Sequence, residues 1–184
     1  DNLDLSSIIF FENWKDLTKV RNKFLQSSNI YEGIMLKKKT SIYHNGRPKG
    51  MWYKWKRDPK SVDAVLMYAQ RGHGKRSSYY SDYTFGVLDG KNLVPIGKAY
   101  SGYTNEELDK LDKFVRKNTI QKFGPVREVE KTLVFEIAFD SISKSKRHKS
   151  GLALRFPRIS KIRWDKSPDE IEDLKRIKDF YKLS

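Results

Sequence analysis

After Asp58-Pro59, the sequence is a series of short β-rich stretches separated by turns, with a single helical pattern inserted among them. β-branched and aromatic residues are concentrated in four stretches that we expect to be strands: Ala64–Gln70, Tyr83–Leu88, Leu93–Tyr100 and Thr132–Phe139. Several short strands with one inserted helix favour a small closed barrel of the OB type, and the same periodicity is compatible with an SH3-like barrel. The expected fold class is mainly β with helices (α+β).

Residues Thr104–Glu107 and Ser167–Glu170 each have the pattern of a capping box, in which two side chains satisfy free backbone amides at the start of a helix. The first box predicts a helix that packs on the sheet through four apolar residues: Leu108, Leu111, Phe114 and Val115. The second box, with Pro168 at the first helical position, predicts a final helix with a similar face: Ile171, Leu174, Ile177 and Phe180.

The residues before Pro59 have a different pattern and predict the end of another domain. Four elements are expected there: a strand at Leu3–Phe10, a helix from Glu12, and strands at Ile30–Leu36 and Met51–Trp55. The boundary near Pro59 gives two parts, residues 1–59 and 60–184. Because the chain starts at Asp1 and not at Met, we expect that upstream sequence is missing.

The net charge of +15 is concentrated in two segments. Residues 32–76 contain twelve basic and three acidic side chains, and residues 144–166 contain nine basic and one acidic. Nucleic acid or nucleotide phosphate is the natural partner of two basic surfaces on a folded domain. A solvated lysine-rich face is the alternative, but the interleaved Trp, Tyr and Phe residues favour binding. Since the chain has no cysteine and no apolar run that could span a bilayer, we expect a cytoplasmic protein.

The stretch Glu32–Lys37 is the first candidate site. Strand alternation would place Glu32 on the face of Ile34 and Leu36, and Lys37 on the opposite face. A carboxylate can hold a divalent metal, and a lysine can neutralise phosphate directly. Ordinary solvated residues at a strand end are the alternative.

The stretch Trp52–Lys56 is the second candidate site. Lys54 and Lys56 share one face of the expected strand with Trp52, and two ammonium groups on one face suit a phosphate. An edge strand that carries lysines against aggregation is the alternative.

The third candidate site is the basic stretch Arg155–Lys166. Arginine side chains bind phosphates through two parallel hydrogen bonds, and Asp165 could orient a neighbouring guanidinium. The alternative is a basic strand that meets a DNA backbone without any catalytic role.

The glycine-rich stretch Gly72–Arg76 lacks the spacing of a Walker loop and the Ser or Thr that follows its lysine. A basic hairpin turn that faces a DNA backbone is the better interpretation. Four residues in or beside it are expected to contact DNA: Arg71, His73, Lys75 and Arg76. The three histidines of the chain lie among basic residues, so no metal-ligand cluster is expected.

These stretches, in this order and spacing, resemble the ATP-dependent DNA ligases, a family of covalent nucleotidyltransferases. Glu32–Lys37 is similar to the fourth nucleotidyltransferase motif of the family, Lys54–Lys56 to the fifth and Arg155–Lys166 to the sixth. Three further stretches are most similar to bacterial ligases associated with an Lhr-type helicase: Gly46–Gly50, Tyr68–Gly74 and Arg147–Gly151.

The resemblance implies the C-terminal part of an adenylation domain in residues 1–59 and an OB-fold DNA-binding domain in residues 60–184. It implies that Glu32 helps to place a catalytic Mg²⁺ or Mn²⁺ ion and that Lys54 and Lys56 contact the α-phosphate of ATP. The remaining implied roles are a nucleotide neighbour for Lys37, orientation of the triphosphate tail for Arg163, Asp165 and Lys166, and phosphate or DNA contacts for Arg155 and Arg158.

The family seals nicks in duplex DNA through a lysyl-adenylate and a DNA-adenylate. The nucleophilic lysine lies in Lys-x-Asp-Gly, whereas Val87 and Leu88 precede the only Asp-Gly of this chain. We therefore expect the chain alone to be inactive in self-adenylylation. The resemblance also implies nicked DNA as partner, a monomer, and a helicase or nuclease as a repair partner. The alternatives are a non-catalytic OB module for single-stranded nucleic acid and, more remotely, an mRNA capping enzyme.

Overall fold

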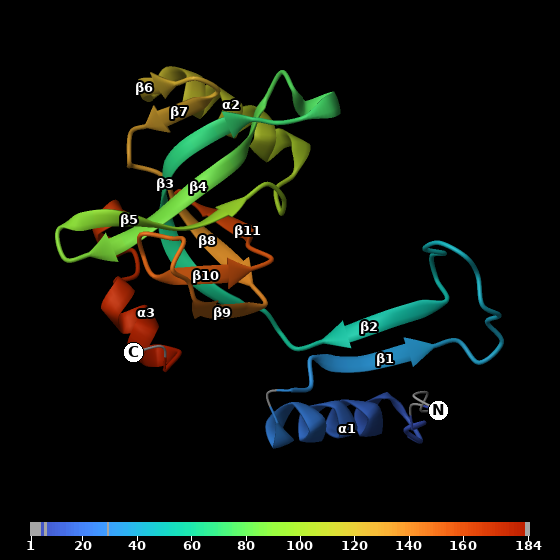
Figure 1. Cartoon of the computed structure of the whole chain (residues 1–184). Coiled ribbons are helices and arrows are strands. Elements are labelled where there is room, and N and C mark those ends of the chain that lie inside the picture. Colours follow the sequence, from blue (N-terminus) through green and yellow to red (C-terminus); the bar gives the residue numbers. More distant parts are fainter. Residues whose placement is uncertain (1–4, 6, 29, 183–184) are drawn as a thin grey trace. The chain divides into compact units, whose positions relative to one another are not determined.

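Figure 1 shows a computed structural model of the chain, which describes residues 5, 7–28 and 30–182. The chain forms two compact units, divided between Asp58 and Pro59. None of the helices in the described residues has the length and apolar character needed to cross a membrane.

The N-terminal unit consists of one helix and a two-stranded antiparallel ribbon. Its elements are α1 (Trp14–Ser27), β1 (Gly33–Lys37) and β2 (Trp52–Lys56). The side chain of Asn13 caps α1 by accepting a hydrogen bond from the backbone amide of Asp16 at 3.0 Å. Leu17 of α1 is buried. The expected helix and the two expected strands that follow it are therefore confirmed, with shifted ends.

The expected strand at Leu3–Phe10 is wrong for the residues that the structure describes. Leu5 and residues 7–10 form no strand, and the other residues of this stretch lie outside the described part of the chain. A strand needs a hydrogen-bonding partner, and among the described residues β1 and β2 pair with each other only. The side chains of Ile8 and Phe10 are consequently exposed.

The C-terminal unit is built on an antiparallel sheet with the strand order β11-β8-β3-β4-β5. These strands are β3 (Lys60–Arg71), β4 (Tyr80–Asp89), β5 (Asn92–Ala99), β8 (Val134–Phe139) and β11 (Arg158–Arg163). The hairpin of β6 (Thr119–Phe123) and β7 (Val126–Val129) extends the sheet where β7 pairs with the end of β3. The pair of β9 (Ser141–Lys144) and β10 (Leu152–Arg155) forms a second small sheet.

The two ends of the main sheet curve toward each other (Figure 1). The backbone amide of Ile159 in β11 donates to the carbonyl of Ser101, just after β5, at 2.9 Å. Leu154 of β10 packs against Gly97 of β5. This closure produces the expected OB-type barrel. The strands β6, β7, β9, β10 and β11 were not among the four strands expected from the sequence, and a basic strand at Arg155–Lys166 was given only as an alternative.

The barrel core is formed by inward-facing side chains of the central strands. Tyr83, Phe85 and Phe135 are fully buried, and the ring centroids of Phe85 and Phe135 are 4.9 Å apart. The helix α2 (Asn105–Lys117) buries Leu108, Leu111 and Val115, and both hydrogen bonds of its predicted capping box are present. The four expected strands and this helix are confirmed.

The expected final helix begins later than the sequence indicated. The capping box at Ser167 is present, but it opens only the 3₁₀ turn η2 (Pro168–Glu170), and α3 (Leu174–Phe180) has its own cap at Asp173. Between them the backbone is extended because Glu172 pairs with the sheet. Its carbonyl accepts from the amide of Leu88 at 3.0 Å and its amide donates to the carbonyl of Asp63 at 3.1 Å.

Gly102 is required where the barrel closes. Its φ is +98°, and a Cβ at this position would lie 2.0 Å from the carbonyl oxygen of Ile159. We expect Gly102→Ala to lower the free energy of unfolding of the C-terminal unit by about 1–3 kcal/mol more than a matched control, because the backbone must shift. The control is Gly124→Ala, whose φ is +54° and whose added Cβ meets nothing within 4 Å.

Hydrogen–deuterium exchange of β3 and β8 peptides across a urea series measures the stability of this unit separately from that of the N-terminal unit. Equal losses in the two variants would show that Gly102 is not needed for closure.

Candidate functional site

Three lysines gather on one exposed face of the β1–β2 ribbon. The facing pairs on that side are Gly33 with Lys56, Met35 with Lys54, and Lys37 with Trp52. The ammonium nitrogen of Lys37 lies 4.6 Å from the centre of the Trp52 ring, a cation–π contact. The structure thus brings Lys37, Lys54 and Lys56 onto one surface, which suits an anionic ligand.

Two arginines that the sequence patterns did not single out hold this ribbon in place. Arg21 of α1 is only 6% exposed; its guanidinium donates to the carbonyl of Lys56 and lies 5.0 Å from the Trp55 ring centre. One terminal nitrogen of Arg57 donates to three backbone carbonyls, those of Leu25 (2.8 Å), Ser28 (3.1 Å) and Tyr31 (3.2 Å). The sequence contained a signal for Arg21. It lies four residues after Leu17, so a helix places its cation on the packed face of α1.

Glu32 lies just before β1, so its expected alternation within the strand is wrong. The strand starts at Gly33, whose φ is +150° and whose added Cβ would lie 2.2 Å from the carbonyl oxygen of Trp55. This close approach interrupts the regular pleat at Gly33, so the strand begins only after Glu32. The Glu32 carbonyl accepts from the amide of Arg57 at 2.7 Å, and the residue is exposed.

Among the described residues, no group of three or more His, Asp or Glu side chains could hold a metal ion by itself. Mg²⁺ is commonly bound through one or two carboxylates, with water and substrate phosphate as the other ligands. The exposed carboxylate of Glu32 is an oxygen ligand of this kind, so the residues present fit a divalent ion that arrives with a phosphate.

The C-terminal unit brings Arg163, Asp165 and Lys166 together around the largely buried carboxylate of Asp63. Asp63 of β3 accepts hydrogen bonds from a terminal nitrogen of Arg163 at 3.3 Å and from the ammonium of Lys166 at 2.5 Å. Asp165 accepts two hydrogen bonds from Arg163, Nε to Oδ1 at 3.0 Å and NH2 to Oδ2 at 2.8 Å. Sequence reasoning missed Asp63, although a charged residue between the apolar Val62 and Ala64 was a visible signal.

The hydrogen bonds and charges within this cluster stabilise its ionised forms. The hydrogen bond from Arg163 lowers the pKa of Asp165 well below its usual range. Reciprocally, the hydrogen bond to Asp165 and the charges of Asp165 and Asp63 raise the pKa of Arg163. The two cations and two carboxylates of this cluster have no net charge. The hydrogen bonds to the carboxylates fix the orientation of the Arg163 and Lys166 side chains.

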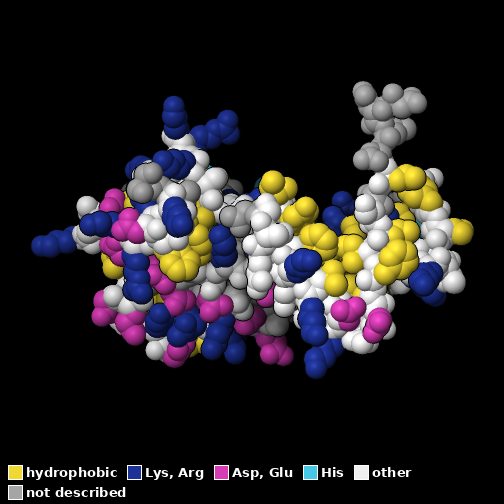
Figure 2. Space-filling model, turned by 90° about the horizontal axis from the view of Figure 1, so that it is seen from below, with side chains coloured by type: hydrophobic (Ala, Val, Ile, Leu, Met, Phe, Trp, Pro, Cys, Tyr) yellow, Lys and Arg dark blue, Asp and Glu magenta, His cyan; other side chains and the backbone are white. Residues whose placement is uncertain are grey.

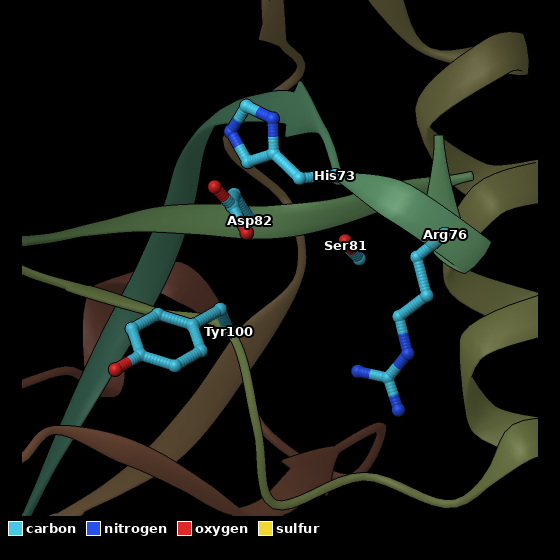
Figure 3. A pocket seen from close by; sticks show the side chains of 5 residues that line it. All are labelled: His73, Arg76, Ser81, Asp82 and Tyr100. Atoms are coloured by element: carbon cyan, nitrogen blue, oxygen red, sulfur yellow. The ribbon is translucent and has the colours of Figure 1, made fainter. Parts of the chain in front are cut away.

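The β3–β4 hairpin contains the other expected DNA contacts. Figure 3 shows His73 and Arg76 at a cavity of about 360 Å³, which is also lined by Ser81, Asp82 and Tyr100. The guanidinium of Arg76 lies 5.5 Å from the ring centre of Tyr103 and donates to its hydroxyl at 3.3 Å. Arg71 and Lys75 are exposed, Arg71 at the end of β3 and Lys75 in the 3₁₀ turn η1 (Gly74–Arg76). The predicted basic hairpin turn is therefore confirmed as a structure.

Arg155 and Arg158 differ in their surroundings. The guanidinium of Arg155 lies 5.3 Å from the ring centre of Phe156, which has a φ of 51° and is exposed. Arg158 forms an ion pair with Asp140 at 3.0 Å.

Residues 76–166 match the family described as "ATP dependent DNA ligase C terminal region". A "Probable DNA ligase" of Koribacter versatilis is 47% identical over 151 residues, which cover 82% of this chain and 26% of that protein. "DNA ligase 1" of Korarchaeum cryptofilum is 38% identical over 154 residues, which cover 82% of this chain and 28% of that protein. The chain therefore spans 26% and 28% of the length of these relatives.

Solved structures of low sequence identity have a similar fold. The ligase domain of M. tuberculosis LigD has a TM-score of 0.55 and 21% identity, over 85% of this chain and 52% of that chain. The structure titled "Pmar-Lig_PreS3" has a TM-score of 0.61 and 19% identity, over 81% of this chain and 30% of that chain. At these identities the likeness supports the fold alone.

The Arg163–Asp165 pair should make the stability of the C-terminal unit depend on pH. Because folding lowers the pKa of Asp165 from about 3.8, its contribution is present above pH 4 and is lost as the pH falls through the lower value of the folded state. Asp165→Asn should therefore be less stable than the wild type at pH 7, and the difference should shrink below pH 4.

The measurement is urea unfolding of β3 and β11, read by hydrogen exchange, at several pH values. Asp109→Asn on the exposed side of α2 is the control and should follow the wild-type curve. A constant difference between Asp165→Asn and the wild type at all pH values would show that the ion pair does not stabilise the unit.

Proposed function

We propose that the chain is the nucleotide-phosphate- and DNA-holding portion of an ATP-dependent DNA ligase, and the match of residues 76–166 to the C-terminal region of this family supports the proposal. Residues 1–59 are the C-terminal part of its adenylation domain, and residues 60–184 are its OB-fold DNA-binding domain. The observation that carries the proposal is the face formed by Lys37, Lys54 and Lys56, in a unit that precedes the barrel.

In this proposal the ribbon holds the nucleotide. Lys54 and Lys56 contact the α-phosphate of ATP and stabilise the charge that develops as the adenylyl group moves. Lys37 is a neighbour of the nucleotide on the same face. Glu32 would hold a Mg²⁺ or Mn²⁺ ion, which when bound offsets the charge of phosphate oxygens.

The second group in this proposal consists of Asp63, Arg163, Asp165 and Lys166, and its ligand is the triphosphate tail of ATP. Arg163 and Lys166 donate hydrogen bonds to the triphosphate tail and orient it, while Asp165 keeps the guanidinium of Arg163 in a fixed plane. Asp63 limits the freedom of both cations, so less conformational entropy is lost when phosphate binds.

Exposed apolar surface supports the assignment of the N-terminal unit as part of a larger domain. Figure 2 shows hydrophobic side chains grouped over the surface of this unit. Large apolar side chains that are at least 70% exposed there are Ile8, Phe10, Trp14, Ile30, Ile42 and Tyr43, among others. Contiguous apolar surface of this kind marks an interaction site, and the rest of the adenylation domain is the proposed cover.

The proposed parent enzyme is a cytoplasmic monomer that seals nicked duplex DNA in repair or replication, with a helicase or nuclease as a repair partner. The reaction starts when a lysine attacks ATP. The family sequence that contains this lysine, Lys-x-Asp-Gly, is not present in the chain, because Val87 and Leu88 precede Asp89-Gly90. We therefore assign binding and orientation of phosphates to this chain, and the nucleophile to another part of the enzyme.

A second candidate is a non-catalytic OB module that binds single-stranded nucleic acid. It is favoured by exposed aromatic side chains of the barrel unit, on which bases could stack: Tyr100, Phe156 and Trp164. Such a module has no use for the lysine face of the ribbon, which precedes the barrel.

Binding to matched DNA substrates separates the two functions. We expect the chain to bind nicked or intact duplex more tightly than a single strand of the same sequence at equal salt, because a duplex presents a higher density of phosphate charge to basic side chains. Fluorescence anisotropy measures the three dissociation constants. A clear preference for the single strand would support the second function and contradict the first.

Two variants that each remove one positive charge test whether the β3–β4 hairpin contacts DNA. Lys75→Gln in the hairpin should reduce the slope of log Kd against log salt concentration by about 1. Lys175→Gln in α3, which is also exposed, is the control and should leave the slope nearly unchanged.

A further inference from the structure

Three arginines from separate elements surround the ring of one buried tyrosine. The guanidinium carbons of Arg116 in α2, Arg71 at the end of β3 and Arg127 in β7 lie 5.5, 5.7 and 5.8 Å from the ring centre of Tyr80. Tyr80 is only 5% exposed. Figure 1 shows that α2 and the β6–β7 hairpin lie at the same end of the sheet as the β3–β4 connection.

Hydrogen bonds hold two of these arginines and the tyrosine in place. Asp112 is buried; it accepts from the amide of Tyr80 at 2.9 Å and from Nε of Arg116 at 2.6 Å. Arg116 also donates to the carbonyl of Ser78 at 2.9 Å. Arg127 donates to the carbonyls of its own β6–β7 turn, at 2.6 and 3.1 Å. The cluster is therefore a built arrangement of side chains, not a set of independent surface arginines.

The charges of this cluster are not balanced within it. Asp112 offsets one guanidinium, and the neighbouring carboxylate of Glu128 is bound to Lys131. In the part of the chain that the structure describes, the guanidinium of Arg71 makes no hydrogen bond or ion pair. The aromatic ring of Tyr80 attracts the three cations, but it supplies no compensating negative charge. Three guanidinium groups with one carboxylate suit an anion with several oxygens.

We propose that Arg71, Arg116 and Arg127, gathered around Tyr80, form a binding site for the phosphate backbone of duplex DNA. Arg116 and Arg127 lie in the stretch between the two basic segments, which is nearly neutral, so only the folded chain reveals this site. Arg71 directly precedes the basic hairpin Gly72–Arg76, which makes the site continuous along the chain with the proposed hairpin contacts. This inference rests on the proposed function and extends the DNA contact to α2 and β7.

The test is the salt dependence of duplex binding by the full chain with Arg71→Gln and Arg127→Gln combined. Arg116 is left in place because it also bonds to Asp112 and Ser78. We expect binding to weaken at least about tenfold. The slope of log Kd against log salt concentration should fall by about 2, since each phosphate contact contributes about 0.9.

The control removes the same charge from α3 by Lys175→Gln combined with Arg176→Gln, both exposed residues. It should change the slope by less than about 0.5, as expected for charges that make no phosphate contact. As a folding control, the hydrogen exchange rates of β3, β4 and β7 must match the wild type in both variants. If the glutamine variant exchanges faster than the wild type, the double variant Arg71→Lys with Arg127→Lys replaces it, and this variant should retain most of the wild-type salt dependence because the charges are kept.

The possible results distinguish failure of the arginine site from failure of the proposed function. If the wild type binds duplex and the Arg71/Arg127 variant has the slope of the control, the arginine site is overturned and the proposed function stands. If the wild type does not bind duplex, the proposed function fails, and the DNA site fails with it. If inorganic phosphate, titrated by ³¹P NMR, binds the wild type but not the variant while both bind duplex equally, the site takes free phosphate and the DNA assignment is overturned.

Discussion

Strand β3 is the constraint on which the C-terminal unit depends, because it is the one described strand that pairs with three others. It pairs with β4 along one edge, and with β8 and then β7 along the other. Asp63 near its start binds Arg163 and Lys166, and Arg71 at its end lies beside Tyr80. A single twelve-residue strand therefore fixes both charged clusters relative to the barrel core.

Carboxylates fix the geometry of basic side chains in this unit. Asp63 and Asp112 are largely buried, and each accepts hydrogen bonds from basic side chains that are more exposed than the carboxylate. A buried carboxylate without such partners would be strongly destabilising, so the sequence can keep Asp63 within an apolar strand only if the cations are present. In the N-terminal unit, Arg21 and Arg57 achieve a similar effect with backbone carbonyls as acceptors. The result in both units is a set of basic side chains held by hydrogen bonds, as the proposed binding of phosphate requires.

Sequence patterns predicted the helices and strands whose apolar residues recur regularly. They failed where hydrogen bonding to the sheet determines the local structure. Apolar spacing predicted the helix α2, and the enrichment in β-branched and aromatic residues predicted the strands β3, β4, β5 and β8. The final helix is delayed because Glu172 pairs with the backbone of β3 and β4. The strands β6, β7, β9 and β10 have only four or five residues, which is too short for a periodic signal. Motif resemblance identified Arg163, Asp165 and Lys166. The apolar neighbours of Asp63 were a signal for that residue, but its partners, and the grouping of Arg116 and Arg127, became visible only when the topology brought distant residues together.

The central claim is that the chain holds phosphates but does not carry the nucleophile that starts ligation. Incubation of the purified chain with ATP labelled at the α-phosphate and Mg²⁺, followed by a denaturing gel, tests it directly. No label should remain on the chain, because the lysine of the Lys-x-Asp-Gly sequence is not among its residues. A covalently labelled chain, with label released by acid as expected for a lysyl-adenylate, would contradict the claim.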